Sequence, residues 1–498
     1  MPDATVTDKD KPRSPQLTVP AAGRSPQAYI DERPNWSDGT VVGMTPMTAM
    51  QWRIWWLAAA GKFFEGLVVF MTGVSLPLIA QEFHISKIEH GMVSAASLAG
   101  ILVGAVGLGG LADRFGRRSM FIVESFVLLA FLALLVVSPN FPWLVTCLFG
   151  LGLALGCDYP TAHLMISESI PSSVRGRLVL AAFGFQALGA LSGTAVGWLV
   201  LKNLPELGAW RWMYATAVIP AALVALRRFA VTESASWLVH RGQIEHACHS
   251  LKRLLSRKPA YPREVRLAAK PEYQRRSGSY RDLFRGRTLR ATVLASAPWF
   301  LQDLSTYGIG IFTPIILVKT LGHRTEHASN LAQLINNDAL AAKGAALIDV
   351  LLMVGIIAAV LLADRLGRIR LQVIGFIGCA AGLFIASLST AATGSTQTIL
   401  IFVGFMLFNF MTNMGPNAQT YLLAGEVFPT YIRGKGAGLA AAFAKVGAVT
   451  TAYLFPVLLA DMGTRTLLHI LVGTSLLGAI VTRLFRIETT GVDLDTLS

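Results

Sequence analysis

The sequence predicts an all-α membrane protein with 12 transmembrane helices in two pseudo-symmetric six-helix bundles. Three observations lead to this fold class: a strongly apolar composition, apolar runs of membrane-spanning length, and short motifs that occur once in each half of the chain. Of the 498 residues, 53% are hydrophobic and 14% are charged. A water-soluble chain of this length carries a larger charged fraction, so the composition indicates a membrane protein.

Twelve apolar runs account for most of the chain. Each run approaches or exceeds the roughly 20 residues that an α-helix needs to cross the hydrocarbon core of a bilayer. They cover residues 54–82, 89–112, 119–138, 141–168, 177–202, 210–229, 291–320, 341–363, 369–391, 397–425, 435–460 and 465–486. We expect the first six runs to form an N-terminal bundle over residues 51–230 and the last six to form a C-terminal bundle over residues 290–487.

Three polar segments lie outside the two bundles. Residues 1–50 are rich in Pro, Asp, Ser and Thr and contain no apolar core of a signal peptide, so we expect a disordered tail. Residues 231–289 form a long basic loop between the bundles, and residues 488–498 form a C-terminal tail.

The positions of Lys and Arg indicate the orientation in the membrane. These residues cluster after the second, fourth, eighth and tenth runs, whereas the loops after the third, fifth, ninth and eleventh runs have almost none. Because cytoplasmic loops carry an excess of Lys and Arg, we expect both termini and the central loop to be cytoplasmic. The expected location is the plasma membrane, or the inner membrane of a bacterium. The net charge of +14 comes largely from these flanking positions, so nucleic acid is not an expected partner.

Several classes of protein do not fit the sequence. It contains no phosphate-cradling loop, no nucleophile–base pair and no soluble domain, which argues against an enzyme, a receptor or an ATP-driven pump. The four cysteines have neither metal-ligand spacing nor extracellular pairing, so we expect no metal site and no disulfide framework. We expect no cofactor. The expected partners are a small-molecule substrate, protons and the lipid bilayer, and we expect a monomer.

Two motifs recur in the second half of the chain. An Asp-Arg-x-Gly-Arg motif at residues 113–117 is repeated 251 positions later, and a Glu-x-x-Pro-x-x-x-Arg-Gly motif at residues 168–176 is repeated 258 positions later. In addition, Asp158-Tyr159-Pro160 falls opposite Pro416-Asn417 at a similar offset. Three matches in the same order indicate a duplication, and two homologous halves with a site between them are typical of secondary transporters.

We expect the charged residues of these motifs to act as a conformational switch. They are Asp113, Arg114, Gly116, Arg117, Glu168 and Arg175 in the first half, and Asp364, Arg365, Arg368, Glu426 and Arg433 in the second half. Charges that pair in one conformation only bias an alternating-access equilibrium by roughly a few kcal/mol. A role in setting topology alone explains the Arg residues but leaves Asp113 and Asp364 unexplained.

Six polar side chains lie at mid-membrane depth. A helix rises about 1.5 Å per residue, so Asp158, ten residues before Glu168, is about 15 Å from the end of its run. The other five are Glu65, Gln186, Asp303, Asn417 and Lys445. An ionisable group at this depth is costly unless it faces a partner or a water-filled cavity. Because the six come in pairs from equivalent runs, we expect one cavity between the halves, lined by Asp158, Gln186, Asp303, Asn417 and Lys445.

Helical spacing extends this site on the seventh run. Trp299, Asp303 and Tyr307 are four residues apart and share one face of a helix. Aromatic residues also form belts at membrane interfaces. Because Trp299 and Tyr307 flank a mid-membrane Asp, we favour a place in the cavity for both of them.

Further polar residues within the spans also need partners. Asn409 shares a face with Asn417 but suits a contact between helices better than a place in the cavity. Lys62 and Glu65 are one turn apart and can neutralise one another. A packing role and a proton relay are both open for His163, and the role of Asp349 is open.

Several segments carry a resemblance to known families. The segment GGLADRFGRR (109–118) resembles the signature loop of the major facilitator superfamily, and ESASWLVHRG (233–242) and ETTGVDL (488–494) resemble its sugar-porter-like branch. Within that branch, the chain is similar to the phosphate:proton symporters in GCDYPTAHLMISE (156–168), WFLQDLSTY (299–307), NMGPNAQTY (413–421) and GLAAAFAKVGA (438–448). The resemblance implies the major facilitator fold and alternating access. It also implies a second acidic residue in the first span, where this chain has Val68.

The leading hypothesis is a proton-coupled symporter of a small anion such as inorganic phosphate. The expected substrate-binding residues are Tyr159, Gln186, Trp299, Asp303, Tyr307, Asn417 and Lys445, and the expected proton-coupling residues are Glu65, Asp158 and Asp303. An ionised Asp303 repels an anion, whereas a protonated one does not, so proton and anion bind best together. The alternative is a proton-coupled transporter with the same mechanism whose substrate is an organic metabolite, such as a sugar, an aromatic acid or another carboxylate.

Overall fold

The computed structural model describes residues 24–33, 46–108, 111–256, 265–267, 279–321, 331–429 and 432–489. Within these ranges, 12 helical segments are long and apolar enough to cross a membrane. The secondary structure of the same ranges is helical, apart from turns and one isolated bridge between Arg24 and Leu267. The predicted all-α fold with 12 spans is therefore confirmed.

The first six spans alternate in direction across the N-terminal half. They are α2 (Ala49–Phe83), α3 (Lys87–Val103) continued by the π-helical turn η1 (Gly104–Leu108), α5 (Arg117–Val136), α6 (Phe141–Ser167), α7 (Ser172–Phe183) continued by α8 (Phe185–Asn203), and α9 (Ala209–Arg228). The short helix α4 (Leu111–Phe115) precedes α5. Polar caps mark the starts of three of these spans: Thr48 and Gln51 form a capping box on α2, Ser86 and Glu89 form one on α3, and Asn140 caps α6.

The C-terminal half repeats this pattern. Its spans are α12 (Gly286–Leu321), α13 (Leu331–Leu366), α14 (Arg368–Leu388) with the 3₁₀ turn η4 (Ser389–Ala391), α15 (Gly394–Met414) continued by α16 (Pro416–Glu426), α17 (Arg433–Asp461) and α18 (Gly463–Leu484). Helix α13 begins about ten residues before the apolar run at residue 341, because Asn336, Asn337 and Asp338 lower the hydropathy of its first turns without ending the helix.

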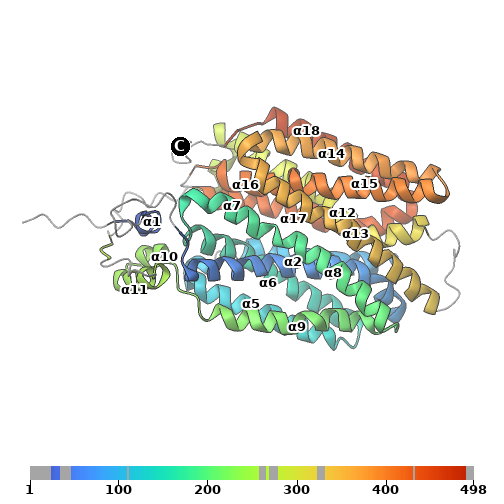
Figure 1. Cartoon of the computed structure of the whole chain (residues 1–498), viewed down its shortest axis with the longest axis horizontal. Coiled ribbons are helices and arrows are strands. Elements are labelled where there is room, and N and C mark those ends of the chain that lie inside the picture. Colours follow the sequence, from blue (N-terminus) through green and yellow to red (C-terminus); the bar gives the residue numbers. More distant parts are fainter. Residues whose placement is uncertain are drawn as a thin grey trace, which may run out of the picture.

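The two halves lie side by side as separate bundles (Figure 1). In the N-terminal bundle α2 packs on α8 and α5 packs between α6 and α9; in the C-terminal bundle α12 packs on α17 and α14 packs between α15 and α18. The halves meet mainly where α3 packs on α17 and α8 packs on α13, with α2 and α12 also in contact. The polar residues that reach the boundary between the bundles therefore come from the helices of both halves.

Short helices gather at the end of the bundles that the sequence predicts to be cytoplasmic. They are α1 (Pro26–Ile30), α10 (Ala235–His240) and α11 (Ile244–Leu254), and Figure 1 shows them together at one end of the molecule. The 3₁₀ turn η3 (Tyr280–Phe284) leads into α12. Thr48 donates to the carbonyl oxygen of Leu254 at 2.6 Å, which ties the start of α2 to the end of α11.

The expectation of disorder through residue 50 is wrong for residues 24–33. Tyr29 and Ile30 in α1 are buried, and the hydroxyl of Tyr29 accepts from the amide of Arg266 at 3.0 Å. The Asp31 carboxylate accepts from the amide and the hydroxyl of Ser172 at 2.7 and 2.8 Å and so caps the start of α7. A polar average over 50 residues does not register two apolar side chains and one capping carboxylate. Residues 1–23 and 34–45 lie outside the described ranges.

Candidate functional site

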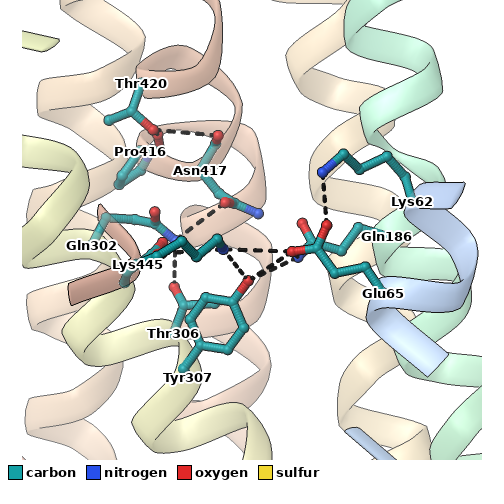
Figure 2. Close-up of polar contacts among 11 residues, drawn as sticks. Lys62, Glu65, Gln186, Gln302, Thr306, Tyr307, Pro416, Asn417, Thr420 and Lys445 are labelled. Atoms are coloured by element: carbon teal, nitrogen blue, oxygen red, sulfur yellow. Dashed lines mark hydrogen bonds and ion pairs between the residues drawn. The ribbon is translucent and has the colours of Figure 1, made fainter. Parts of the chain in front are cut away.

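A cluster of charged side chains lies at the boundary between the two bundles. We call Lys62, Glu65, Gln186, Asp303, Tyr307 and Lys445 the central cluster. Lys445 Nζ lies 3.5 Å from Glu65 Oε1 and 3.4 Å from Asp303 Oδ2, and Lys62 Nζ lies 2.7 Å from Glu65 Oε2. Figure 2 shows Lys62, Glu65 and Gln186 approaching Lys445 and Tyr307 from the opposite side. The four charged groups are at most 5% exposed.

Hydroxyl and amide groups complete the central cluster. Lys445 donates to the Tyr307 hydroxyl at 2.7 Å. Tyr307 donates in turn to Glu65 at 3.3 Å, and Gln186 Nε2 donates to both Glu65 and Tyr307 at 3.3 and 3.1 Å. Glu65 belongs to α2, Gln186 to α8, Tyr307 to α12 and Lys445 to α17, so each of these contacts joins different helices. The central cluster therefore links the N-terminal half to the C-terminal half.

Close packing of α2 on α8 brings Gln186 to Glu65. A methyl group on Gly66 would lie 2.0 Å from the carbonyl oxygen of Gln186, and one on Gly189 would lie 2.0 Å from that of Phe63. Only glycine at these two positions lets the backbones approach so closely. The reach of the Gln186 amide into the cluster depends on that approach.

A polar extension of the cluster leads to α16. Gln302 donates to Thr306 at 2.7 Å and to the Asn417 amide oxygen at 3.2 Å (Figure 2). Asn417 donates to Asn413 at 2.6 Å. A cavity is lined by Phe70, Gln186, Thr306, Tyr307, Asn413 and Asn417. The break between α15 and α16 at Gly415, followed by Pro416, starts α16 one residue before Asn417.

Aromatic side chains from both halves form a wall beside Lys62. The rings of Phe183 and Tyr421 are stacked, with centroids 4.5 Å apart, and Trp299 meets Tyr421 edge to face at 6.2 Å. Lys62 Nζ lies 6.0 Å from the centre of the Phe183 ring. His163 Nδ1 lies 3.1 Å from the Tyr421 hydroxyl, which gives His163 a contact across the boundary. Such a wall offers flat apolar surface next to a buried cation.

The charges of the central cluster balance. Two Lys residues face two carboxylates, and each charge has a partner of opposite sign within 3.5 Å. Burying such groups is compensated only by good mutual geometry. An anion that enters the cluster must therefore compete with Glu65 and Asp303 for Lys445.

Asp158 does not join the central cluster. Its carboxylate accepts from Arg228 Nη2 at 2.6 Å, and Arg228 Nη1 also binds Glu124 at 2.9 Å, all within the N-terminal bundle. The expectation that Asp158 lines a cavity between the halves is therefore wrong. Depth along a helix does not specify which way a side chain points. Arg228 was missed because it reads as a basic residue flanking the end of its span. Glu124 was missed although an acidic residue inside the third apolar run is itself a signal of a buried partner.

Asp349 has partners from two neighbouring spans. Thr194 of α8 donates to Asp349 Oδ2 at 3.2 Å, and Asn409 of α15 donates to Asp349 Oδ1 at 3.1 Å. The expected helix–helix contact of Asn409 is thus confirmed. The bond to Thr194 crosses from one half to the other, so Asp349 is a further polar link between the halves, in addition to the central cluster and the His163–Tyr421 contact.

The repeated loop motifs form similar ion pairs in the two halves. Arg117 Nη2 lies 3.5 Å from Glu168 Oε1, and Arg368 Nε lies 3.5 Å from Glu426 Oε2. Each pair joins the third span of its half to the fourth. Arg175 donates to Ser172, and Arg114 and Arg365 are exposed. The side chains of Asp113, Tyr159, Asp364 and Arg433 lie outside the described part of the structure.

Two glutamates outside the motifs cap the start of the third span of their own half, α5 and α14, which comes earlier in the chain. Glu233 accepts from the amides of Arg117 and Arg118 at 3.0 Å each. Glu488 accepts from the amides of Arg368 and Ile369 at 3.0 and 3.3 Å. Carboxylates are favourable at helix N-termini. Burial raises the pKa of the Glu233 carboxyl, and the amide donors oppose that shift.

Two further features occur in both halves. A hydroxyl residue follows each capping glutamate, and a glycine precedes each capped helix. Ser234 donates to Glu168, and Thr489 donates to Glu426 at 2.5 Å. Gly116 and Gly367 precede α5 and α14 with φ of 102° and 87°, a conformation that favours glycine. The segments after the sixth and twelfth spans were singled out in the sequence only by resemblance, and the structure shows what they contact.

Two similar bundles of six spans, with a buried charged cluster where they meet, define a membrane transporter of the secondary type. The family model described as "Sugar (and other) transporter" matches residues 40–498. The chain therefore belongs to this transporter family of the major facilitator superfamily, as its resemblance predicted.

Curated relatives and solved structures agree with this assignment. The niacin transporter NiaP of Acinetobacter baylyi is 30% identical over 406 residues, which cover 81% of this chain and 86% of the relative. A repressible high-affinity phosphate permease of Neurospora crassa is 29% identical and covers 72% of this chain and 68% of the relative. The proton:xylose symporter XylE bound to 6-bromo-6-deoxy-D-glucose has a TM-score of 0.72 at 20% identity, covering 90% of this chain and 98% of XylE. These relatives are transporters and not enzymes.

Proposed function

We propose that this protein is a proton-coupled symporter of a small anion, which binds at Lys445. The observation that carries this proposal is a buried Lys at the boundary of the halves, held by two carboxylates from different helices. An anion bound there would replace carboxylates that already occupy the same cation. The site is thus selective for negative charge and coupled to the ionisation of its own acids.

Asp303 is the proposed coupling residue. Lys445 Nζ is 3.4 Å from Asp303 Oδ2, close enough for Asp303 to compete with an anion for the ammonium group. Protonation of Asp303 removes that competition and leaves Lys445 free to bind the anion. Once the anion is bound, the site carries excess negative charge, which favours the proton on Asp303. Each ligand therefore raises the affinity for the other, as symport requires.

Alternating access follows from the links between the halves. The Glu65–Lys445 pair and the Gln186–Tyr307 hydrogen bond join the bundles at the centre. A substrate that takes over Lys445 weakens the first link, so occupancy changes the relative free energies of the open states. The capped loop motifs at the predicted cytoplasmic end are proposed to set the bias between those states.

Inorganic phosphate is the first candidate substrate. Gln186, Tyr307 and Asn417 line one cavity, and Lys445 donates to the Tyr307 hydroxyl. Several donors close together suit an anion with many acceptor oxygens. Its similarity to a phosphate permease supports this candidate.

A planar aromatic carboxylate is the second candidate. The stacked rings of Phe183 and Tyr421, with Trp299 at their edge, lie beside Lys62. A flat ring fits between aromatic faces while its carboxylate meets a Lys. The similarity to a niacin transporter supports this candidate, because niacin is an aromatic carboxylate.

Uptake into proteoliposomes tests the proposal. Purified protein is reconstituted, an inward proton gradient is imposed, and accumulation of labelled phosphate, nicotinate and xylose is compared with that in protein-free liposomes. We expect one of the two anions to accumulate above its equilibrium level and to lose that accumulation when a protonophore collapses the gradient. Accumulation of xylose alone would overturn the assignment of an anion, and accumulation unaffected by the protonophore would overturn proton coupling.

A further inference from the structure

Asp349 is a buried carboxylate that joins the two halves of the molecule outside the central cluster. It belongs to α13 and is 3% exposed. Its Oδ2 atom lies 3.2 Å from the hydroxyl of Thr194 on α8, and its Oδ1 atom accepts from the amide of Asn409 on α15 at 3.1 Å. Thr194 and Asn409 are buried as well. One ionisable group from the C-terminal half thus meets only neutral partners, one of them from the N-terminal half.

The charged residues of the surrounding helices do not compensate Asp349, which takes part in no ion pair among the described residues. Helix α15 has no charged residue, and the single charged residue of α8, Lys202, is exposed, as is Lys343 on α13. The lysines of the central cluster are held by Glu65 and Asp303. The charged residues of α7, α14 and α16 lie near the loop motifs. A carboxylate buried without a cation is costly, and such a group takes up a proton instead.

The hydrogen bonds of Thr194 indicate where that proton fits. A threonine hydroxyl has one hydrogen to donate and two lone pairs that accept. Besides Asp349, the carbonyl oxygens of Ala190 and Leu191 lie within reach of the Thr194 hydroxyl, at 3.2 and 3.1 Å. An ionised Asp349 must take the single hydrogen for itself. A protonated Asp349 instead donates to the Thr194 oxygen and leaves the hydroxyl hydrogen for a backbone carbonyl.

We propose that Asp349 is a proton-binding site, and that its proton joins the two halves through a hydrogen bond from Asp349 Oδ2 to the Thr194 oxygen. Oδ1 then remains the acceptor of the Asn409 amide. Every polar atom of the site has a partner in this arrangement, and the buried negative charge is removed. The site belongs to the C-terminal half and to the contact of α8 with α13, whereas the central cluster lies where α2, α12 and α17 meet.

The proton-binding site lies one helical turn beyond the proposed substrate cavity. The same three helices line that cavity with Ala190, Leu352 and Asn413. Thr194, Asp349 and Asn409 follow on these helices after three or four positions, a rise of about 5–6 Å. Each lies toward the end of its helix that is opposite the loop motifs. The site therefore borders the side of the cavity that faces away from the predicted cytoplasmic end.

This position links the proton to the contact between the halves. Separation of α8 from α13 on this side would remove Thr194 from Asp349 and expose the carboxyl group to water, where it is ionised at neutral pH. Closure of the same contact therefore favours uptake of a proton, and the bound proton favours closure in return. The neutral form also spares an anion in the cavity the repulsion of a nearby carboxylate. This role in transport rests on the function proposed above, but the bound proton can be detected without any transported substrate.

Infrared difference spectroscopy of the protein in lipid bilayers, without substrate and at neutral pH, tests the proposal. A protonated carboxylic acid has a carbonyl stretch separate from the amide bands, and the stretch shifts in deuterated water. The spectrum of Asp349→Asn minus wild type is expected to show a negative band at this position, because the variant has lost the protonated group. Asp461→Asn removes an exposed carboxylate and is the matched control, with no such band expected. A difference spectrum of Asp349→Asn without the negative band would overturn the proposal.

Thr194→Val tests the proposed hydrogen bond and keeps the test decisive where Asp349→Asn fails to fold. The variant keeps the size of the side chain but removes the acceptor, so the band is expected to persist and to move to a higher frequency. Thr216→Val on α9 is its control, because that hydroxyl donates to the carbonyl oxygen of Met213. A band that does not move in Thr194→Val would overturn the bridge between the halves. Failure of these spectra would leave the proposed roles of Asp303 and Lys445 intact, and failure of anion uptake in proteoliposomes would leave the band unchanged.

Discussion

Glu65 Oε1 and Lys445 Nζ lie 3.5 Å apart and join the N-terminal half of the molecule to the C-terminal half at its centre. Both side chains are buried, so the attraction is weakly screened by solvent. A pair in this position must lengthen or exchange partners when the halves rotate about the site. The Lys445 ammonium group is therefore both the proposed ligand of the anion and one partner in the link between the halves.

Lys445→Ala tests the anion site. Removing a buried cation from the site is expected to weaken anion binding at every pH, by roughly 2–5 kcal/mol if the anion is desolvated there. Binding of whichever anion is transported is measured by scintillation proximity or calorimetry over a range of pH. Lys343→Ala is the matched control, because Lys343 is exposed on α13. An unchanged affinity in Lys445→Ala would rule out Lys445 as the anion ligand.

Asp303→Asn separates coupling from binding. The substitution keeps the shape of the side chain but replaces the ionisable carboxyl group by an amide. Exchange of substrate across the membrane is therefore expected to continue. Accumulation driven by a proton gradient is expected to be lost, and binding is expected to lose much of its pH dependence. Counterflow and gradient-driven uptake in proteoliposomes measure the two properties separately.

Asp461→Asn is the control for that substitution, because Asp461 is an exposed carboxylate at the end of α17, 3.8 Å from Lys87. It is expected to behave as wild type in both assays. Asp303→Asn protein that still concentrates substrate would move the coupling role to Glu65 or to Asp158.

Glu233→Ala and Glu488→Ala test the caps at the predicted cytoplasmic end. Each loses an acceptor for two helix amides, a change that costs about 1 kcal/mol in other helix caps. The substitutions are expected to slow transport while leaving substrate affinity largely unchanged, because neither residue touches the central cluster. Glu245→Ala, a carboxylate in the first turn of α11, is the control. Transport at wild-type rates in both cap variants would show that the caps do not bias the cycle.

Cysteine labelling tests the orientation. Ser256→Cys at the end of α11 and Ser395→Cys at the start of α15 introduce exposed thiols near opposite ends of the bundles. A membrane-impermeant maleimide applied to intact cells is expected to label Ser395→Cys at once and Ser256→Cys only after permeabilisation. The reverse result would invert the predicted topology.

The sequence by itself determined the fold class of this protein. Apolar runs of spanning length and motifs repeated at offsets of 251 and 258 were sufficient, because the bilayer imposes a helix length and a duplication leaves matching residues. The depth of Glu65, Gln186, Asp303 and Lys445 also followed from the sequence, because the rise per residue of a helix is constant.

Only the tertiary structure decided which of the deep residues meet. Asp158 shares its depth with Lys445 but points into the N-terminal bundle, where Arg228 and Glu124 meet it. The rotation of a helix about its axis depends on contacts with neighbouring helices, such as the packing of Asp158 against Gly61, and no periodicity within one span records it. Sequence therefore located the polar residues along the membrane normal, and packing between helices assigned them either to the central cluster or to the group of Glu124, Asp158 and Arg228.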